Sequence, residues 1–462
     1  MRAMMSRTVA AVAVLAASTA LAQTPARQQP PAGGAPRPFT LPAADTYTLP
    51  NGLGVTLVPY GTVPKVRVHL AVDAGNVDET PQQVWLADLT GELLKEGTTT
   101  RSAEAVAESL ATMGGSLGVS VGGDVTSIST DVLAEYAGDA VRIIADVAQR
   151  PGLPASELPR LKADMVRNLT LARSQPSALA QEQFAKVLYG AHPYGRVFPT
   201  PAMVEGFGHD DVAAFHAANF GASRAHIYVV GRFDEAAVRA AVKSAFAEWR
   251  KGTPARRAAP SPSSARALHV IDRPKAPQST LFIGLPVVDP SHADYTALRV
   301  TNALLGGSFA SRITSNIREQ KGYTYSPNSQ LVTHPKVAHW VQVADVTTAV
   351  TGASIKEILF EIDRLRTEAP PSDELEGIAN YLAGVFVLQN SSRGGIIAQL
   401  EFTRQHGLGA DYLRTVVQKI QAVTSADVRR IAETYLDPAK MTMVVVGDTS
   451  QIEEQVAPYK SR

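Results

Sequence analysis

The stretch WLADLTGELLKEGT, residues 85–98, decides the fold of this 462-residue chain. Its apolar residues recur three and four positions apart, which predicts a helix between residues 82 and 94. Asp88 and Glu92 are four residues apart and therefore lie on one face of that helix, with Gly91 directly before Glu92. A helix presents two ligands to one metal ion at this spacing, so the chemistry of these positions matters.

A second stretch, REQKGYTYS at residues 318–326, combines an arginine, a glycine and two tyrosines. Gly322 is expected to end a helix, which places Arg318 in the last turn and Tyr325 on the strand that follows. Tyr323 is two residues from Tyr325 and would share its strand face, so either tyrosine is a candidate. An arginine offers fixed donors to carbonyl oxygens, and a phenol can donate to a developing oxyanion.

Together these stretches resemble the pitrilysin/insulinase-type zinc metallopeptidases. The first domain of that family carries a helix reading roughly A-H-x-x-E-H-x-L-x-x-G-T, in which the histidines bind zinc and the glutamate is the general base. On this frame Asp88 and Glu92 replace the histidines, and Gly91 replaces the base. The family's third ligand, a glutamate on a later helix, corresponds to Asn168, 76 residues after Glu92. The second stretch matches the family motif R-E-x-x-G-x-x-Y-S without a change.

The four replacements predict a chain without a catalytic zinc ion or other cofactor of its own. Catalytic zinc sites favour imidazole or thiolate ligands, but the chain has no cysteine and none of its 10 histidines is four residues from another. Losing both imidazoles, the carboxylate ligand and the base removes the Lewis acid and the proton acceptor together. The chain is therefore not expected to hydrolyse peptides alone, and the resemblance implies that zinc is held by a partner chain.

The composition describes a globular protein with no electrostatic attraction to polyanions. Hydrophobic residues make up 45% of the chain and charged residues 19%, enough to build a sizeable core. The 44 Lys and Arg residues nearly cancel the 43 Asp and Glu residues, and no long basic run occurs. Nucleic acids and anionic membranes are therefore not expected as partners.

The N-terminus reads as a secretory signal peptide, residues 1–22. A basic start precedes an apolar stretch from Val9 to Ala20, and a small-x-small site places cleavage after Ala22. The stretch is too short to span a bilayer comfortably, so the mature protein is expected in the periplasm or outside the cell without a membrane anchor. The alternative is an uncleaved N-terminal anchor. Residues 23–44, rich in Pro, Gln, Ala and Gly, are expected to form a disordered tether.

The folded part is predicted to consist of two related domains. Residues 251–266 are rich in Pro, Ser and Ala and lack periodicity, which predicts a linker between an N-terminal domain, 45–250, and a C-terminal domain, 267–462. Asp211 leads through a helix to a strand ending at Gly231, and Asp427 leads to one ending at Gly447. Because Asp211 and Asp427 are 216 residues apart, as are the two glycines, an internal duplication is indicated.

The predicted fold class is α+β, with two homologous α/β sandwich domains that each layer helices on one sheet face. The resemblance agrees, because it implies the metalloenzyme fold of the LuxS and processing-peptidase type. Two further segments resemble family motifs. His192, in an HPYG segment, is interpreted as a loop-packing residue, and Gly306-Gly307 as a tight turn that leads into a helix.

The leading functional hypothesis is a non-hydrolytic subunit of a secreted or periplasmic zinc metallopeptidase. The resemblance implies that Arg318 binds the peptide substrate and that Tyr325 acts in trans near the scissile carbonyl, in an active site shared with a homologous zinc-bearing chain. The first alternative is a peptide-binding or structural protein on a peptidase fold with no catalytic partner. For the two residues themselves the alternative is structural: Arg318 would cap a helix C-terminus and Tyr325 would pack between domains. An enzyme with an unrecognised site is a third possibility, but no nucleophile and base motif supports it.

Overall fold

The computed structural model describes residues 42–255, 258–409 and 411–460. The predicted signal peptide and residues 23–41 of the predicted tether lie outside the described residues. Residues 42–44 belong to no helix or strand. Among the described helices, none combines the length and apolar character needed to cross a membrane.

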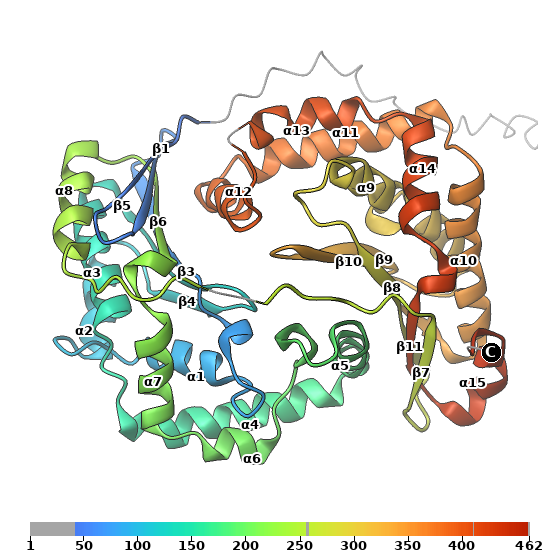
Figure 1. Ribbon diagram of the computed structural model, residues 1–462, viewed down its shortest axis with the longest axis horizontal. Helices are drawn as coiled ribbons and strands as arrows, with labels where there is room; N and C mark the ends of the chain where they lie inside the picture. Colours follow the sequence, from blue (N-terminus) through green and yellow to red (C-terminus); the bar gives the residue numbers. More distant parts are fainter. Residues whose placement is uncertain (1–41, 256–257, 410, 461–462) are drawn as a thin grey trace, which may run out of the picture. The chain divides into compact units, whose positions relative to one another are not determined.

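The described chain contains two sets of strands and helices in similar order (Figure 1). The first set comprises β1 (Asp45–Thr48), β2 (Gly54–Pro59), β3 (Lys65–Val72), α1 (Leu86–Leu93), α2 (Ala103–Thr112), β4 (Gly118–Val121), β5 (Thr126–Leu133), α3 (Ala137–Gln149), α4 (Leu158–Ser174), α5 (Pro176–Tyr189), α6 (Pro201–Gly206), α7 (His209–Asn219), β6 (Ala225–Gly231) and α8 (Glu235–Phe246). The second comprises β7 (Ala267–Asp272), β8 (Gln278–Val287), α9 (Tyr295–Asn302), β9 (Asn328–His334), β10 (Val337–Thr347), α10 (Thr351–Thr367), α11 (Ser372–Gln389), α12 (Arg393–Gln405), α13 (Tyr412–Gln421), α14 (Ser425–Tyr435), β11 (Thr442–Gly447) and α15 (Thr449–Val456).

The two sheets have the same topology, which confirms the predicted pair of homologous α+β domains. The first runs in the order β1-β2-β6-β3-β5-β4 and the second in the order β7-β11-β8-β10-β9, so β1 is an addition at one edge. In both sheets the strand ending at Gly231 or Gly447 pairs in parallel with one neighbour and antiparallel with the other. The helices α7 and α14, which contain Asp211 and Asp427, precede these strands as the duplication predicts.

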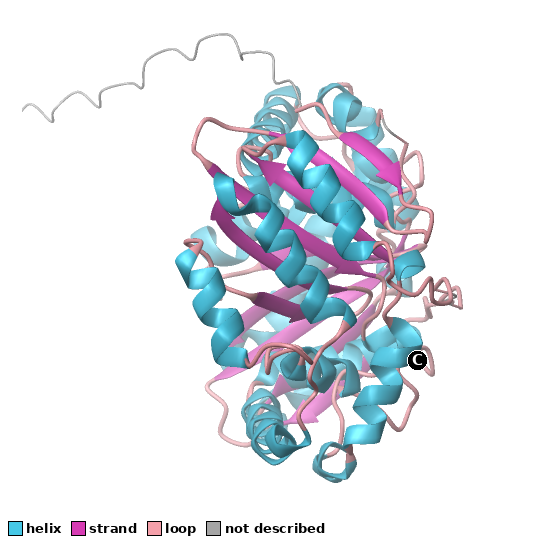
Figure 2. Cartoon of the chain, turned by 90° about the vertical axis from the view of Figure 1, so that its left-hand side faces the viewer, coloured by secondary structure: helices cyan, strands magenta, loops and turns pink. Residues whose placement is uncertain are grey.

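Alternation along the strands sends side chains to two different cores. Val66, Val68 and Leu70 of β3 are buried in the core shared with α3, whereas Ala71 faces a separate apolar cluster on the other side of the sheet. The left side of Figure 1, with α3 and α8, faces the viewer in Figure 2, where helices lie across the strands. One face of each sheet is therefore covered by helices of its own half.

The other face of each sheet is covered by a helix from the opposite half, so the prediction of helices on one face only is wrong. Phe184 and Leu188 of α5 pack with Val341 of the second sheet. Ile396 and Ile397 of α12 pack against the first sheet. Both faces of each sheet carry apolar side chains that must be buried. The apolar pattern of the strands indicates this, but it does not identify which helix covers each face.

The two exchanged helices are held differently. Arg404 of α12 donates to both carboxylate oxygens of Asp73, at 2.7 and 2.8 Å, and Arg393 donates to both of Asp131, at 3.1 Å. The contact of α5 is mainly apolar, with one buried hydrogen bond of 2.8 Å between the Tyr189 hydroxyl and His339 Nδ1. The α12 contact thus combines apolar packing with two ion pairs, whereas the α5 contact is mainly apolar.

The docking of α5 can be tested with two leucines in neighbouring helices. Leu188 is 1% exposed against the second sheet, whereas Leu171 of α4 is 58% exposed. We expect Leu188→Ala to lower the free energy of unfolding by about 2–5 kcal/mol, because it leaves a cavity, and Leu171→Ala to change it by less than about 0.5 kcal/mol. Urea unfolding measures both. Equal effects of the two substitutions would contradict the exchange of α5.

Candidate functional site

The helix α1 is fixed at its start by a buried carboxylate that the sequence analysis did not identify. Glu79, 6% exposed, accepts hydrogen bonds from the backbone N–H groups of Ala87 at 2.8 Å and Trp85 at 3.1 Å. Trp85 itself adopts a left-handed conformation with φ of 72° just before the helix. Glu79 therefore satisfies amides that the first helical turn leaves without partners, and the helix begins at Leu86 rather than near residue 82.

Asp88, the first of the two positions that hold histidine in the resembled family, is held inside this polar cluster. Asn76 Nδ2 donates to Asp88 Oδ2 at 2.7 Å and to Glu79 Oε1 at 3.2 Å. Burial raises the pKa of Asp88, although the hydrogen bond from Asn76 opposes the shift. Burial also raises the pKa of Glu79, to about 8. Asp88 thus serves as an acceptor within the protein.

Glu92, the second of these positions, forms an ion pair with Lys95, one helical turn further on. Its side chain is 45% exposed, unlike that of Asp88. Asn168 is exposed on α4. The three positions are therefore engaged separately, and within the described part of the chain no group of three or more His, Cys, Asp or Glu side chains could hold a metal ion.

Gly91, at the position where the resembled family has its general base, lies in close contact with strand β4. A Cβ atom built on Gly91 would lie 2.5 Å from Cγ2 of Val121 in β4, closer than any real contact. The strand β4 therefore packs directly on α1 at this glycine, where a glutamate would need Val121 to move. A zinc ion does not fit these residues, because the donors present are two diverted carboxylates and one exposed amide.

The second stretch, residues 318–326, ends a π-helix, η7 (Thr314–Gln320), with Arg318 in its last turn. Gly322 has φ of +64° and its N–H donates to the Arg318 carbonyl at 3.1 Å, so it terminates the helix as predicted. The prediction that Tyr325 lies on a strand is wrong, because β9 begins only at Asn328. Pro327, which lacks an N–H group, directly precedes that strand.

The two tyrosines occupy different environments. Tyr323 packs partly buried against the second core, whereas the side chain of Tyr325 is 86% exposed. Since the segment is a loop, the expectation of a shared strand face is also wrong. Of the two phenols, that of Tyr325 is the more available to a ligand.

The segment with Gly306 and Gly307 is a second π-helix, η6 (Ala303–Gly307), and not the predicted tight turn. A Cβ atom on Gly306 would lie 2.6 Å from Gln342 Oε1 and from Ser329 Oγ. Glycine is required here because the helix packs against β9 and β10 without room for a side chain. This close approach fixes the start of the loop that contains Phe309.

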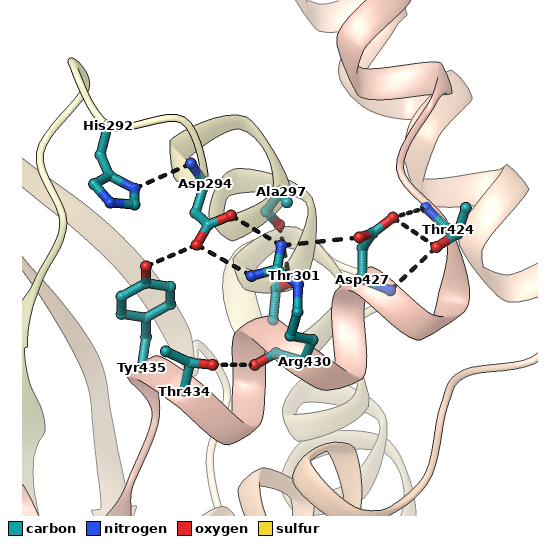
Figure 3. A network of polar contacts seen from close by, with 9 residues as sticks. All are labelled: His292, Asp294, Ala297, Thr301, Thr424, Asp427, Arg430, Thr434 and Tyr435. Atoms are coloured by element: carbon teal, nitrogen blue, oxygen red, sulfur yellow. Dashed lines mark hydrogen bonds and ion pairs between the residues drawn. The ribbon is translucent and has the colours of Figure 1, made fainter.

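The helix α9 that leads into η6 is anchored by the polar network in Figure 3. Asp294 accepts two hydrogen bonds from Arg430 of α14, at 3.1 and 2.8 Å, and one from the Tyr435 hydroxyl at 2.8 Å. The hydrogen bonds from Arg430 lower the pKa of Asp294. This network ties α9 to α14.

The segment between the two π-helices, and η7 itself, are held by polar contacts with neighbouring helices. Arg312, 8% exposed, donates to both oxygens of Glu374 in α11 at 2.8 Å. Asn316 donates to Glu361 of α10 at 2.8 Å. Contacts with α10 and α11 thus fix the position of residues 312–316, which lie just before Arg318.

This support brings Arg318 against Phe309, a contact that the sequence analysis missed. The guanidinium carbon lies 4.4 Å from the centre of the Phe309 ring, and Nη1 lies 3.3 Å from Glu319 Oε1. Phe309 is 72% exposed, and the Arg318 side chain is 28% exposed. Arg318 and Phe309 are nine residues apart in the sequence, and no spacing rule identifies their pairing.

The HPYG segment joins the two halves. Tyr194 donates to Asp124 Oδ1 at 2.8 Å and stacks on His334 at a centroid distance of 3.9 Å. His334 Nδ1 lies 3.1 Å from Asp124 Oδ2, which links the β4–β5 turn to the end of β9. His192 accepts from the Tyr194 N–H at 3.3 Å and contacts the Ala258 carbonyl, as expected of a residue that packs within a loop.

Gly91 offers a test of the close packing between α1 and β4. We expect Gly91→Ala to lower the free energy of unfolding by about 1–3 kcal/mol because the new methyl group collides with Val121. Gly377 in α11 is the matched control: a Cβ atom there meets no heavy atom within 4 Å, so Gly377→Ala should stabilise the protein by about 0.5–1 kcal/mol. Urea unfolding separates the two. A stabilising Gly91→Ala would contradict this packing.

Glu79 offers a test of the buried carboxyl group. Its folded-state pKa of about 8 exceeds its ordinary value of 4.5, so the folded state holds a proton that the unfolded state releases between those pH values. Stability should therefore fall as the pH rises from about 5 to 8, by on the order of 1 kcal/mol per pH unit, and the fall should be smaller in Glu79→Gln. Unfolding at pH 5 and pH 8 measures it. Parallel profiles for both proteins would rule out this assignment.

Two family models match most of the chain. Residues 55–201 match the model described as insulinase (peptidase family M16), and residues 206–382 match the model described as the peptidase M16 inactive domain. The first covers α1, and the second covers η6, η7 and Tyr325.

Curated relatives and solved structures agree with the two family models in pointing to M16 peptidases. The uncharacterized zinc protease YmxG of Bacillus subtilis is 25% identical over 75% of this chain and 84% of its own length, and an uncharacterized zinc protease of Mycobacterium leprae is 27% identical over 77% and 78%. The structure of a peptidase M16 inactive domain from Pseudomonas fluorescens is 24% identical with a TM-score of 0.81, covering 88% of this chain and 98% of that one. A protease from Helicobacter pylori is 19% identical, also with a TM-score of 0.81, covering 88% and 100%. The fold is thus that of M16 peptidases, and the chain belongs to the insulinase family.

Proposed function

We propose that this chain is the non-hydrolytic subunit of a zinc metallopeptidase and that it contributes substrate-binding groups to a homologous zinc-bearing chain. The observation that carries the proposal is a contrast between its halves. In the first half, Asp88, Gly91 and Glu92 are engaged in hydrogen bonding, packing and an ion pair. In the second half, Arg318 and Tyr325 stand on an anchored support with their polar groups accessible.

Arg318 and Tyr325 have the chemistry that a peptide backbone requires. The guanidinium group would donate to carbonyl oxygens of the bound peptide and hold it in register. The Tyr325 hydroxyl would donate to the carbonyl oxygen under attack, where negative charge develops in the transition state. Such a donor accelerates hydrolysis only if another chain supplies the attacking water and its activation, since the described residues include no group of side chains that could hold a metal ion.

The edge of the first sheet supports peptide binding. Among the described strands β4 pairs with β5 alone, so its outer backbone groups are available to an added strand. It packs directly on α1. An extended, unstructured peptide is the substrate class that fits such an edge.

The partner and the location complete the proposal. Relatives of this chain are named zinc proteases, which supports a zinc-bearing homologue as the catalytic partner. The basic and apolar start of the sequence supports secretion to the periplasm or beyond, with the signal peptide removed.

The test is reconstitution with a homologue that carries an intact His-x-x-Glu-His motif. Neither chain alone should cleave an unstructured fluorogenic peptide at the rate of the mixture. In the complex Tyr325→Phe should lower kcat about 100-fold to 1000-fold, because one hydroxyl donor is lost, and Arg318→Ala should raise KM. Tyr323→Phe, at the partly buried tyrosine, is the control and should retain activity. Metal analysis should find zinc that Asp88→Ala does not remove.

Three outcomes would contradict parts of this proposal. Full activity of Tyr325→Phe in an assembled complex would remove the oxyanion role. A partner equally active without this chain would leave a peptide-binding or structural protein as the function. Zinc bound to the purified chain and lost on Asp88→Ala would show that the first half still holds a metal site.

A further inference from the structure

We infer that Phe309 is a positioning residue for Arg318: its ring holds the guanidinium group in the orientation that meets the substrate. The inference rests on the proposed role of Arg318 in peptide binding. The Arg318 guanidinium carbon lies 4.4 Å from the centre of the Phe309 ring, within the range of a cation–π contact. Phe309 is 72% exposed, so burial in the core does not account for a large apolar side chain at this place.

Arg318 also contacts Glu319, so the Phe309 ring is one of two groups that orient its guanidinium group. Glu319, the neighbour of Arg318, has its carboxylate 3.3 Å from Nη1 and is 57% exposed. An exposed ion pair and an exposed cation–π contact are similarly weak, so neither alone fixes the guanidinium group. Removing the ring leaves the existing ion pair with Glu319 to orient the guanidinium group by itself, so more of the Arg318 donors would turn to that carboxylate and away from the peptide.

The backbone around Phe309 is built for positional accuracy. Phe309 follows η6, where Gly306 packs tightly against Gln342 and Ser329, and it precedes the partly buried pair of Arg312 and Glu374. Arg318 lies in η7, so both members of the stacked pair are set by π-helical segments. Such segments are rare and occur often at functional sites.

The ring has one alternative role, which is direct contact with the substrate. A double-mutant cycle separates the two roles, because a residue that acts through Arg318 loses its effect when Arg318 is absent. Direct contact would persist in the Arg318→Ala background.

The first experiment uses this chain alone and needs no substrate. Proton and nitrogen NMR of the Arg318 side chain should show an upfield ring-current shift in the wild type. That shift should persist in Phe309→Tyr and disappear in Phe309→Leu. An Arg318 side chain with identical shifts in the wild type and Phe309→Leu would overturn the stacking on which the inference stands.

The second experiment uses the reconstituted complex and the same fluorogenic peptide. Phe309→Leu should raise KM about 2-fold to 5-fold with little change in kcat, the size expected of one exposed cation–π contact. Phe309→Tyr should restore the wild-type KM, and Phe309→Leu should have no further effect in the Arg318→Ala background.

The outcomes distinguish this inference from the proposed function. If Arg318→Ala raises KM and Phe309→Leu does not, the positioning role is wrong and the proposed function stands. If Phe309→Leu raises KM equally with and without Arg318, the ring binds substrate directly and the positioning role is again wrong. If Arg318→Ala leaves KM unchanged, the proposed binding role of Arg318 fails, and the inference fails with it.

Discussion

The exchange of α5 and α12 between the two sheets is the constraint on which the rest of the structure depends. Each sheet has two faces that avoid water, and the helices of its own half cover only one of them. The helix that follows α4 crosses to the second sheet, and the helix that follows α11 crosses to the first. Neither half can therefore complete its layers alone, and the relative placement of the two halves is set by packing.

Within this frame the two halves differ in how their polar side chains are engaged. In the first half the polar groups of α1 and its surroundings are engaged internally: Asn76 donates to Asp88, Glu79 accepts from amides at the start of α1, and Val121 lies against Gly91. In the second half, Arg318 lies in the last turn of η7, and the exposed Tyr325 lies in the loop that follows it. A fold can be kept while its site residues differ, because packing constrains the positions of helices and strands, whereas ligands are individual side chains.

Local patterns in the sequence predicted what local physics decides. The turn at Gly322 and the duplicated strands that end at Gly231 and Gly447 follow from neighbouring residues. The exchange of helices, the buried Glu79 and the pairing of Phe309 with Arg318 depend on residues brought together by tertiary packing, which periodicity does not encode. Tyr325 was misplaced because strand alternation was extended through a segment that Pro327 interrupts.

The connection between α8 and β7 takes on another meaning beside the exchanged helices. Its described residues form neither helix nor strand, and they run over part of the range predicted as the linker. The two halves contact each other through α5 and α12. The main effect of the covalent connection is therefore to keep each half at a high effective concentration near the other. In that respect the molecule resembles a dimer whose two related subunits are covalently linked. Cleavage of the connection at one site would leave two fragments held together by the same helix contacts.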